Sequence, residues 1–472
     1  MLSLDINSLR QAYAGGDVTP SQIIEEIYDR IEARGKDGVW ISVVPRESAL
    51  QRARDLEASD QAARKKLPLF GLPFSVKDCI DVVDMRTTAG CPDFAYTAKK
   101  TNLAVARALG AGALLVGKTN LDQFATGLVG VRTPYGVAEN PFGSDLIPGG
   151  SSSGAAVSVA TGLVGFAFGT DTGGSGRIPA GFNNIVGLKP TLGLLSKTDM
   201  TNACRTLDTV SIFALTAADA LEVLNICTAR DLLDAYARTP PDARLPAYRD
   251  HAPFTFAVPQ ENQRQFFGND GAGALFKEAI GELTRMGGKE AAIDYGPFLE
   301  TNDFMFNGPW LAERLVSVSP FINDKPDSLH PVTREVILRA EKYSAADLVE
   351  GLYRLKILHN HISGLLDGVD VMVVPTAGTI YRICEVEADP VTLNANMGYY
   401  TNFVNLLDLA AISVPNGFLP DGVPMGITLI GPAFSDSYLA GLAGAFHGRR
   451  VDRLGATDFS VPELVERELA VR

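Results

Sequence analysis

The chain has 472 residues, of which 46% are hydrophobic and 21% charged, a composition typical of a soluble globular protein. Its formal net charge of −13 disfavours nucleic acid as a partner, since phosphate binding needs clustered lysine and arginine, but a small anionic substrate needs only one or two local cations. No apolar stretch approaches the length of a membrane span, and the N-terminus is polar where a signal peptide is apolar. We therefore expect a cytoplasmic protein that binds neither nucleic acid nor membrane.

The cysteine and histidine patterns favour neither a disulfide framework nor a metal site. The cysteines are odd in number and form no C-x-x-C pair, so we expect free thiols in a reducing compartment. No histidine belongs to a pattern with metal-ligand spacing. We expect no metal and no cofactor, and we assign the histidines to the surface or to ordinary packing. The cysteines are Cys79, Cys91, Cys204, Cys227 and Cys384, and the histidines are His251, His330, His359, His361 and His447.

The N-terminal region, about residues 1–65, is predicted to be helical. Helical periodicity runs from Leu4 to Arg34, where Thr19 is a candidate N-cap and Pro20 would occupy the first helical position of a helix. A second helix is predicted to begin near Ser48.

Alternating strands and helices follow this region. A short apolar run at Leu72–Val76 predicts a buried strand that ends at the charged pair Lys77 and Asp78. Residues 102–127 have the pattern helix, glycine, strand, helix. The stretch from Gly149 to Ser196 repeats the alternation, because its apolar middle predicts a buried helix and then a buried strand.

The second half of the chain begins with a polar, proline-rich connection at about 230–251, which we expect to be exposed. Strands are then predicted at 254–259, from Val369, in ISVPNGF and in MGITLIGP, and helices at 271–286, 309–318, 331–340, 345–366 and 437–446. The whole chain, residues 1–472, is predicted to be a single α/β domain with a mixed β-sheet core covered by helices on both faces, and with no separate C-terminal domain.

The Gly149–Ser196 stretch is the strongest candidate for a functional site. Segments rich in glycine and serine are often flexible linkers, but here the buried helix and strand hold both polar loops in place. Backbone N–H groups of such a fixed loop can point at a ligand. Two other motifs are excluded. No G-x-x-x-x-G-K-[ST] phosphate loop is present, and the G-x-S-x-G around Ser152 follows a proline-containing loop rather than a strand.

Serine chemistry with lysine as the base fits the residues that are present. A serine hydroxyl becomes a nucleophile when a base removes its proton, and burial can lower the pKa of a lysine enough for it to act as that base. Lys77 is the candidate base, and the N–H groups after Asp171 could form an oxyanion hole. The alternatives without catalysis are that the serines only cap helices or turns and that Lys77 is a surface cation paired with Asp78. The candidate serines are Ser151, Ser152, Ser153 and Ser175.

Three segments together resemble the amidase signature family: GLPFSVKD, which contains Lys77, then GGSSSG and GTDTGGSGRIPA. The resemblance implies an amidase signature fold and a Ser-cisSer-Lys triad. In that triad Lys77 would be the base, Ser151 the bridging serine on a cis peptide bond, and Ser175 the acyl nucleophile. Ser175 lies 24 residues after Ser151, as the family pattern requires.

The same resemblance assigns supporting roles around Ser175. Asp171 and Arg177 would hold the loop, and no cofactor would be required. The oxyanion hole would be formed by N–H groups of Thr172, Gly173 and Gly174.

Within the family, further segments such as NGPWLAER and LHPVTR resemble the allophanate hydrolases. This implies cleavage of a small amide that carries a carboxylate, with release of ammonia, and a functional link to urea carboxylase. Arg314 would bind the carboxylate and Gly127 would line the pocket; otherwise Arg314 is a surface charge paired with Glu313. Position 306, eight residues before Arg314, is Phe306 where the family usually has a tyrosine whose hydroxyl also contacts the carboxylate.

Several alternatives remain open at this stage. The substrate could be another small amide, such as malonamate or a biuret-like compound, or the chain could be a glutamine-dependent amidotransferase subunit that supplies ammonia to a partner. A non-catalytic binding protein is disfavoured, because all three triad residues are present. The resemblance also favours a homodimer.

Overall fold

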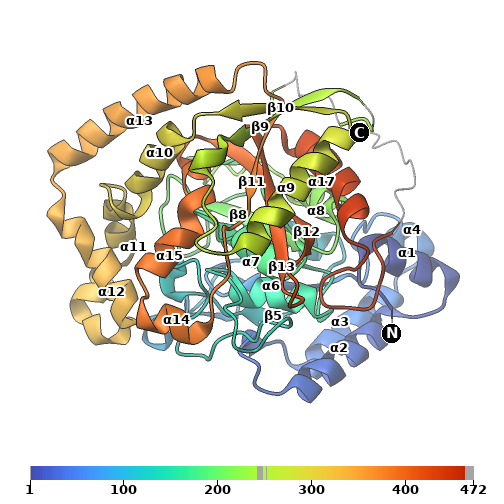
Figure 1. The fold of residues 1–472 in the computed structure, drawn as a ribbon. Coiled ribbons are helices and arrows are strands. Elements are labelled where there is room, and N and C mark those ends of the chain that lie inside the picture. The colour runs from blue at the N-terminus through green and yellow to red at the C-terminus, as the bar shows by residue number, and fades with distance from the viewer. Residues whose placement is uncertain (1, 242–247, 251, 463–472) are drawn as a thin grey trace.

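An eleven-stranded sheet forms the centre of the computed structural model, which describes residues 2–241, 248–250 and 252–462 (Figure 1). Its strands are β1 Trp40–Val43, β2 Pro73–Lys77, β5 Leu114–Thr119, β6 Phe166–Asp171, β7 Val186–Lys189, β8 Thr209–Ala214, β9 Phe254–Pro259, β10 Gly288–Ile293, β11 Val371–Pro375, β12 Leu409–Phe418 and β13 Pro424–Pro432. Two further strands, β3 Arg86–Thr87 and β4 Tyr96–Thr97, form a separate ribbon.

The sheet is mixed. Its order is β1-β5-β2-β6-β8-β7-β12-β13-β11-β9-β10. Strands β5, β2 and β6 run parallel, the pairs from β6 to β11 are antiparallel, and β11, β9 and β10 are again parallel. Helices cover both faces, so the predicted α/β fold with a mixed sheet is confirmed.

The helices fall into groups that pack on different parts of the sheet. Helix α17 contacts α8, α9 and strands β12 and β13, whereas α6 contacts α7 and strands β2, β5, β6 and β8. The bounds are α1 Ile6–Gly15, α2 Pro20–Arg34, α3 Arg46–Glu57, α4 Gln61–Arg64, α5 Leu103–Gly110, α6 Ser153–Ala160, α7 Ile178–Phe182, α8 Ala217–Cys227, α9 Asp270–Arg285, α10 Gly296–Phe306, α11 Leu311–Asp324, α12 Pro331–Leu338, α13 Ala345–Leu365, α14 Ile383–Ala388, α15 Thr392–Met397, α16 Phe403–Leu406 and α17 Asp436–Arg450.

The N-terminal region is helical as predicted, with one exception. Thr19 caps α2: its side chain accepts from the Gln22 amide, the Gln22 side chain accepts from the Thr19 amide, and Pro20 is the first helical residue. Between α2 and α3, however, the chain forms strand β1, which pairs antiparallel with β5 at the edge of the sheet. The four-residue length of β1 gives too few alternations for a sequence pattern to reveal it.

The Gly149–Ser196 stretch contains the predicted buried helix, α6, and buried strand, β6. Every residue of both elements is buried. Because β2 and β6 are adjacent and parallel, Lys77 at the end of β2 and the loop after Asp171 lie at the same edge of the sheet.

The prediction of a helix after β5 is wrong. Residues Gln123–Ala125 form a single 3-10 turn, in which Phe124 and Ala125 have positive φ. The cause is Asp122, whose carboxylate accepts the backbone amides of Gly130 and Arg132 and so folds the chain back on itself.

Other elements have no counterpart in the prediction, among them β3, β4, β7, β8, α8, β10, α10, α14, α15 and α16. The polar, proline-rich connection has no helix or strand in its described part, residues 230–241 and 248–250. The prediction for the rest of that connection, and for His251, falls outside the described residues. All five cysteines are free. Within the described ranges, no helix is both long and apolar enough to cross a membrane.

Candidate active site

Lys77 is fully buried and contacts two hydroxyl groups. Its Nζ donates to Ser151 Oγ at 2.7 Å and to Thr170 Oγ1 at 2.7 Å. Burial lowers the pKa of Lys77, although the nearby carboxylates of Asp122, Asp208 and Asp171 oppose that effect. The partner of Asp78 is Lys118, 3.1 Å away, so the alternative of a surface Lys77–Asp78 pair is wrong.

Ser151 is held by its backbone as well as by Lys77. The peptide bond between Gly150 and Ser151 is cis, as the resemblance implied. The Ser151 carbonyl accepts the Asp122 amide at 3.0 Å. A side chain at position 150 would overlap the Asp122 carboxylate, which explains the glycine. Ser152 points elsewhere, because its hydroxyl donates to the Thr170 carbonyl at 3.1 Å.

The loop after β6 is organised by Asp171. Its carboxylate accepts the amides of Gly174 and Gly176 at 2.9 and 3.1 Å and pairs with the Arg177 guanidinium at 2.8 Å. Burial alone would raise the pKa of the Asp171 carboxyl, but the paired Arg177 holds it below its ordinary value. Asp171 and Arg177 therefore fix the shape of the loop that carries Ser175.

Ser175 lies in this loop with 2% of its surface exposed. Among the residues that the structure describes, its hydroxyl has no hydrogen-bond partner, and neither do the amides of Thr172, Gly173 and Ser175 itself. The amide of Gly174 is instead bound to Asp171, so the structure does not support the expected role of Gly174 as an oxyanion donor. The structure brings Lys77 and Ser151 into contact and places Ser175 in the neighbouring loop.

The C-terminal half of the chain holds the same loop from the other side. Thr401 Oγ1 donates to the Gly173 carbonyl at 2.7 Å, and Asn405 Nδ2 donates to the Asp171 carbonyl at 2.8 Å. Sequence reasoning missed these residues and Thr170. The one signal for Thr170 was its place in the GTDTGGS motif, where it precedes Asp171; Thr401 and Asn405 reach the loop only through folding.

Arg314, on α11, is buried and has no carboxylate partner among the described residues. Its Nη1 donates to Thr126 Oγ1 at 3.1 Å and to the Ala125 carbonyl at 3.3 Å, and its Nε has no partner. Its guanidinium lies 5.0 Å from the centre of the Phe306 ring. Glu313 accepts from Thr206 instead, so Arg314 is not a surface charge paired with Glu313.

A buried guanidinium without a carboxylate partner is costly unless an anion binds to it. Gly127 follows the Thr126 contact, and a side chain there would overlap the Asp122 carboxylate. In the described part of the chain, no group of three or more histidine, cysteine, aspartate and glutamate side chains could hold a metal ion.

A buried lysine that donates to a serine, beside a loop with free amides, is the arrangement that nucleophilic attack on a carbonyl carbon requires. The Amidase family matches residues 22–439. The chain therefore belongs to the amidase signature family and is an amidase.

Known proteins resemble the chain to different extents. It is 41% identical over 428 residues to urea amidolyase of Saccharomyces cerevisiae, a match that covers 90% of this chain and 23% of that protein. The match to urea amidolyase of Lachancea kluyveri covers 22% of that protein, so the chain spans less than a quarter of the length of these relatives. One component of the glutamyl-tRNA(Gln) amidotransferase of Symbiobacterium thermophilum is also 30% identical, over 93% of this chain and 95% of that component.

Among solved structures, allophanate hydrolase of Kluyveromyces lactis superposes with a TM-score of 0.88 at 38% identity. That superposition covers 94% of this chain and 72% of the other.

Proposed function

We propose that the protein hydrolyses the terminal amide of a small substrate that carries a carboxylate, most simply allophanate, and releases ammonia. The observation that carries this proposal is the buried Arg314, which has no carboxylate partner among the described residues. Its guanidinium donates to Ala125 and Thr126, in the turn that begins at Asp122, and the Asp122 amide in turn donates to the Ser151 carbonyl. The likeness to proteins named allophanate hydrolase and urea amidolyase supports the same substrate.

In the proposed mechanism, Lys77 is neutral and Ser151 relays a proton to it. Ser175 Oγ bonds to the amide carbon while its proton passes through Ser151 to Lys77 Nζ. The amides of Thr172, Gly173 and Ser175 donate to the oxyanion. The C–N bond then breaks as the proton returns through Ser151 to the nitrogen, and ammonia leaves. Water hydrolyses the acyl-enzyme by the same relay.

Ammonia release by purified protein tests the proposal, with allophanate, malonamate, biuret, acetamide, an aryl amide and glutamine as substrates. We expect allophanate to have the highest kcat/KM and Ser175→Ala to lower it at least about 10³-fold. The matched control is Ser158→Ala, which changes a different buried serine, one that lies on α6. Full activity in Ser175→Ala contradicts the mechanism, and a preference for the aryl amide contradicts the substrate.

Glutamine turnover would favour a second candidate, a glutamine-dependent amidotransferase component. The likeness to a component of the glutamyl-tRNA(Gln) amidotransferase, over nearly the whole length of that component, supports this alternative. Activity of the isolated chain on allophanate but not on glutamine would exclude it.

The proposed substrate also defines a proposed partner reaction. Allophanate is a carboxylated urea, so we propose that a urea carboxylase supplies it, which agrees with relatives named urea amidolyase. The free thiols favour a reducing compartment such as the cytoplasm.

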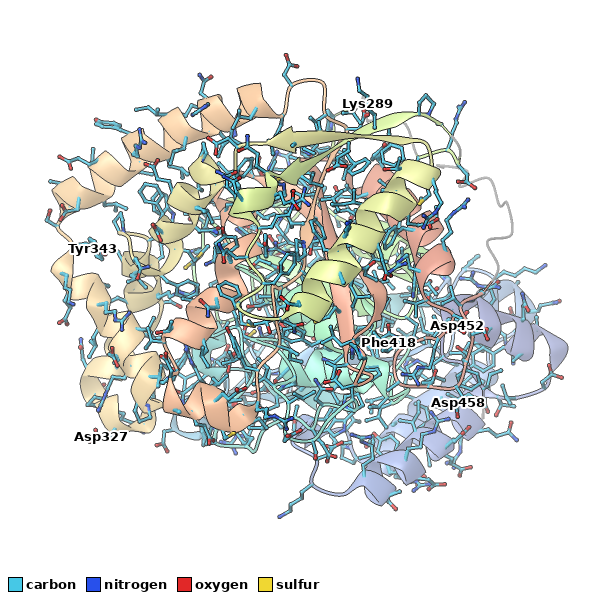
Figure 2. The ribbon with its side chains drawn as sticks, in the orientation of Figure 1. Lys289, Asp327, Tyr343, Phe418, Asp452 and Asp458 are labelled. Carbon is cyan, nitrogen blue, oxygen red and sulfur yellow. The ribbon has the colours of Figure 1, made fainter. Side chains whose placement is uncertain are left out.

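We also propose a homodimer formed through α13, which runs along the outer margin of the molecule after Tyr343 (Figures 1 and 2). In an antiparallel pair of these helices centred near Tyr353, Glu350 of one copy would face Lys356 of the other, and the exposed apolar side chains would be covered. These side chains are Val349, Leu352, Tyr353 and Ile357.

The mass of the protein in solution, from light scattering after size exclusion, tests this surface. We expect a dimer for the unmodified chain and for the control Leu232→Glu, which changes an exposed leucine that is not part of α13. Tyr353→Glu should give a monomer. An unmodified chain that is monomeric at micromolar concentration overturns the proposal.

A further inference from the structure

Asp208 is a buried carboxylate beside the candidate active site to which the proposed mechanism gives no role. It precedes strand β8, which pairs antiparallel with β6 so that Thr209 lies opposite Asp171. This register places Asp208 next to the loop with the free amides. Only 1% of the residue is exposed.

The contacts of Asp208 connect it to that loop. Its Oδ1 accepts the Thr172 hydroxyl at 2.5 Å, and its Oδ2 accepts the Ala203 amide at 2.7 Å; both oxygens also lie 3.2 Å from the Cys204 amide. Within the described ranges, no lysine or arginine forms an ion pair with it. A buried carboxylate whose partners in the described part of the chain are a hydroxyl and amides is costly, which points to a role for Asp208 beside the site.

The charge of Asp208 also acts on the cations of the site. It favours the protonated form of Lys77. Burial raises the pKa of the Asp208 carboxyl, and the Thr172 hydroxyl and the nearby Lys197 oppose that rise. Cys79 and the carboxylates of Asp122 and Asp171 also act on the charge of Lys77. The next residue, Asp78, is paired with Lys118 on the neighbouring strand β5.

We propose that Asp208 is a positioning residue, which fixes Thr172 at the start of the oxyanion loop and places a negative charge near the base Lys77. The Thr172 hydroxyl fixes the direction of the adjacent backbone amides, which must point at the developing oxyanion. The charge sets the pH range in which Lys77 is neutral. This inference rests on the proposed function, because it assigns the loop and Lys77 their roles there.

Two substitutions separate these effects. Asp208→Asn removes the charge, so protonated Lys77 loses a stabilising neighbour and its pKa falls. We expect the acidic limb of the kcat/KM profile to move to lower pH by about one unit, and kcat to fall about tenfold with little change in KM. Thr172→Val keeps the charge but removes the hydroxyl, so kcat should fall about tenfold without a shift of the pH limb.

Further variants allow the inference to be tested even if Asp208→Asn does not fold. Thr172→Ser retains the hydroxyl and should keep kcat within about twofold of the unmodified protein. Asp234→Asn changes another buried aspartate, which accepts the amides of Lys197 and Tyr236, and should leave the pH profile in place. Equal kcat in Thr172→Val and the unmodified protein, or an acidic limb that stays in place or moves to higher pH in Asp208→Asn, overturns the inference.

The amide that the protein turns over fastest serves as substrate in these assays. Loss of activity in Ser175→Ala together with a normal Thr172→Val refutes only the role of Asp208. Full activity in Ser175→Ala refutes the proposed function itself.

Discussion

Arg314, which we propose binds the substrate carboxylate, lies over the ring of Phe306. The phenyl ring supports the guanidinium through its face but offers no hydrogen-bond donor. In the proposed binding mode, position 306 therefore contributes no hydrogen bond to the carboxylate.

Restoring a hydroxyl at this position should strengthen binding of an anionic substrate. In Phe306→Tyr we expect KM for the carboxylated amide to fall at least about tenfold, as one added hydrogen bond to a charged group allows, with kcat nearly unchanged. KM for acetamide, which has no carboxylate, is the control and should not change. An equal change for both substrates would show that position 306 alters the pocket in general.

The sequence indicated some residues of the candidate active site and missed others, for a physical reason. Lys77 and Ser151 belong to motifs, and their predicted contact is present at 2.7 Å. Thr170 and Asp208 are a threonine on a strand and an aspartate in a loop, types common at such positions whatever their role. Only folding shows that they reach Lys77 and Thr172.

At the scale of elements, a buried ion pair joins the ends of β2 and β5. Lys118 Nζ lies 3.1 Å from Asp78 and donates to Thr87 Oγ1 at 2.7 Å, and neither member of the pair is exposed. Removing one partner leaves the other charge buried and unpaired, which costs more than losing an exposed pair.

We expect Lys118→Met to lower the free energy of unfolding by about 3–5 kcal/mol, measured by chemical denaturation. The double variant Asp78→Asn/Lys118→Met should recover most of this loss. Arg354→Met, which breaks an exposed pair with Glu300, should cost less than about 1 kcal/mol. Equal losses of unfolding free energy in Lys118→Met and Arg354→Met would show that burial of the ion pair is unimportant.

Element prediction succeeded where the pattern was local and failed where a distant contact decided the structure. The cap at Thr19 and the burial of α6 follow from neighbouring residues. The turn after β5 depends on a carboxylate that bonds residues 8 and 10 positions later, which overrides the helical pattern. Strand β10, at the edge of the sheet, has mixed exposure and lacks a clear alternation.

At the scale of the whole molecule, the α/β class and the mixed sheet were predictable, but the strand order was not. The order places β12 and β13 between β7 and β11, so strands from both halves of the chain form one sheet. Periodicity reports which face of a strand is buried and carries no information about its neighbours.

Acid stability of the whole molecule should depend on His447, which is buried on α17. Burial lowers its pKa from 6.5 to about 4. The unfolded chain therefore binds a proton before the folded protein does, so this residue's contribution is present above pH 6.5 and is lost as pH falls towards 4. The shift corresponds to about 3 kcal/mol.

His447→Leu should remove that dependence. Between pH 7 and pH 4, the free energy of unfolding of the unmodified protein should fall by about 3 kcal/mol more than that of the variant. Parallel stability curves for the two proteins over this range would contradict the assignment. His361→Leu, on α13, is the control and should leave the slope unchanged.

The complete burial of α6 and β6 has a consequence for how the protein loses activity on heating. Both serine loops begin or end at these two elements, so the loops cannot rearrange widely unless the interior of the sheet opens. Heating should therefore yield no population that is folded but inactive. The temperature at which activity disappears and the temperature at which the sheet melts should coincide, and amide hydrogens in α6 should exchange only through global unfolding.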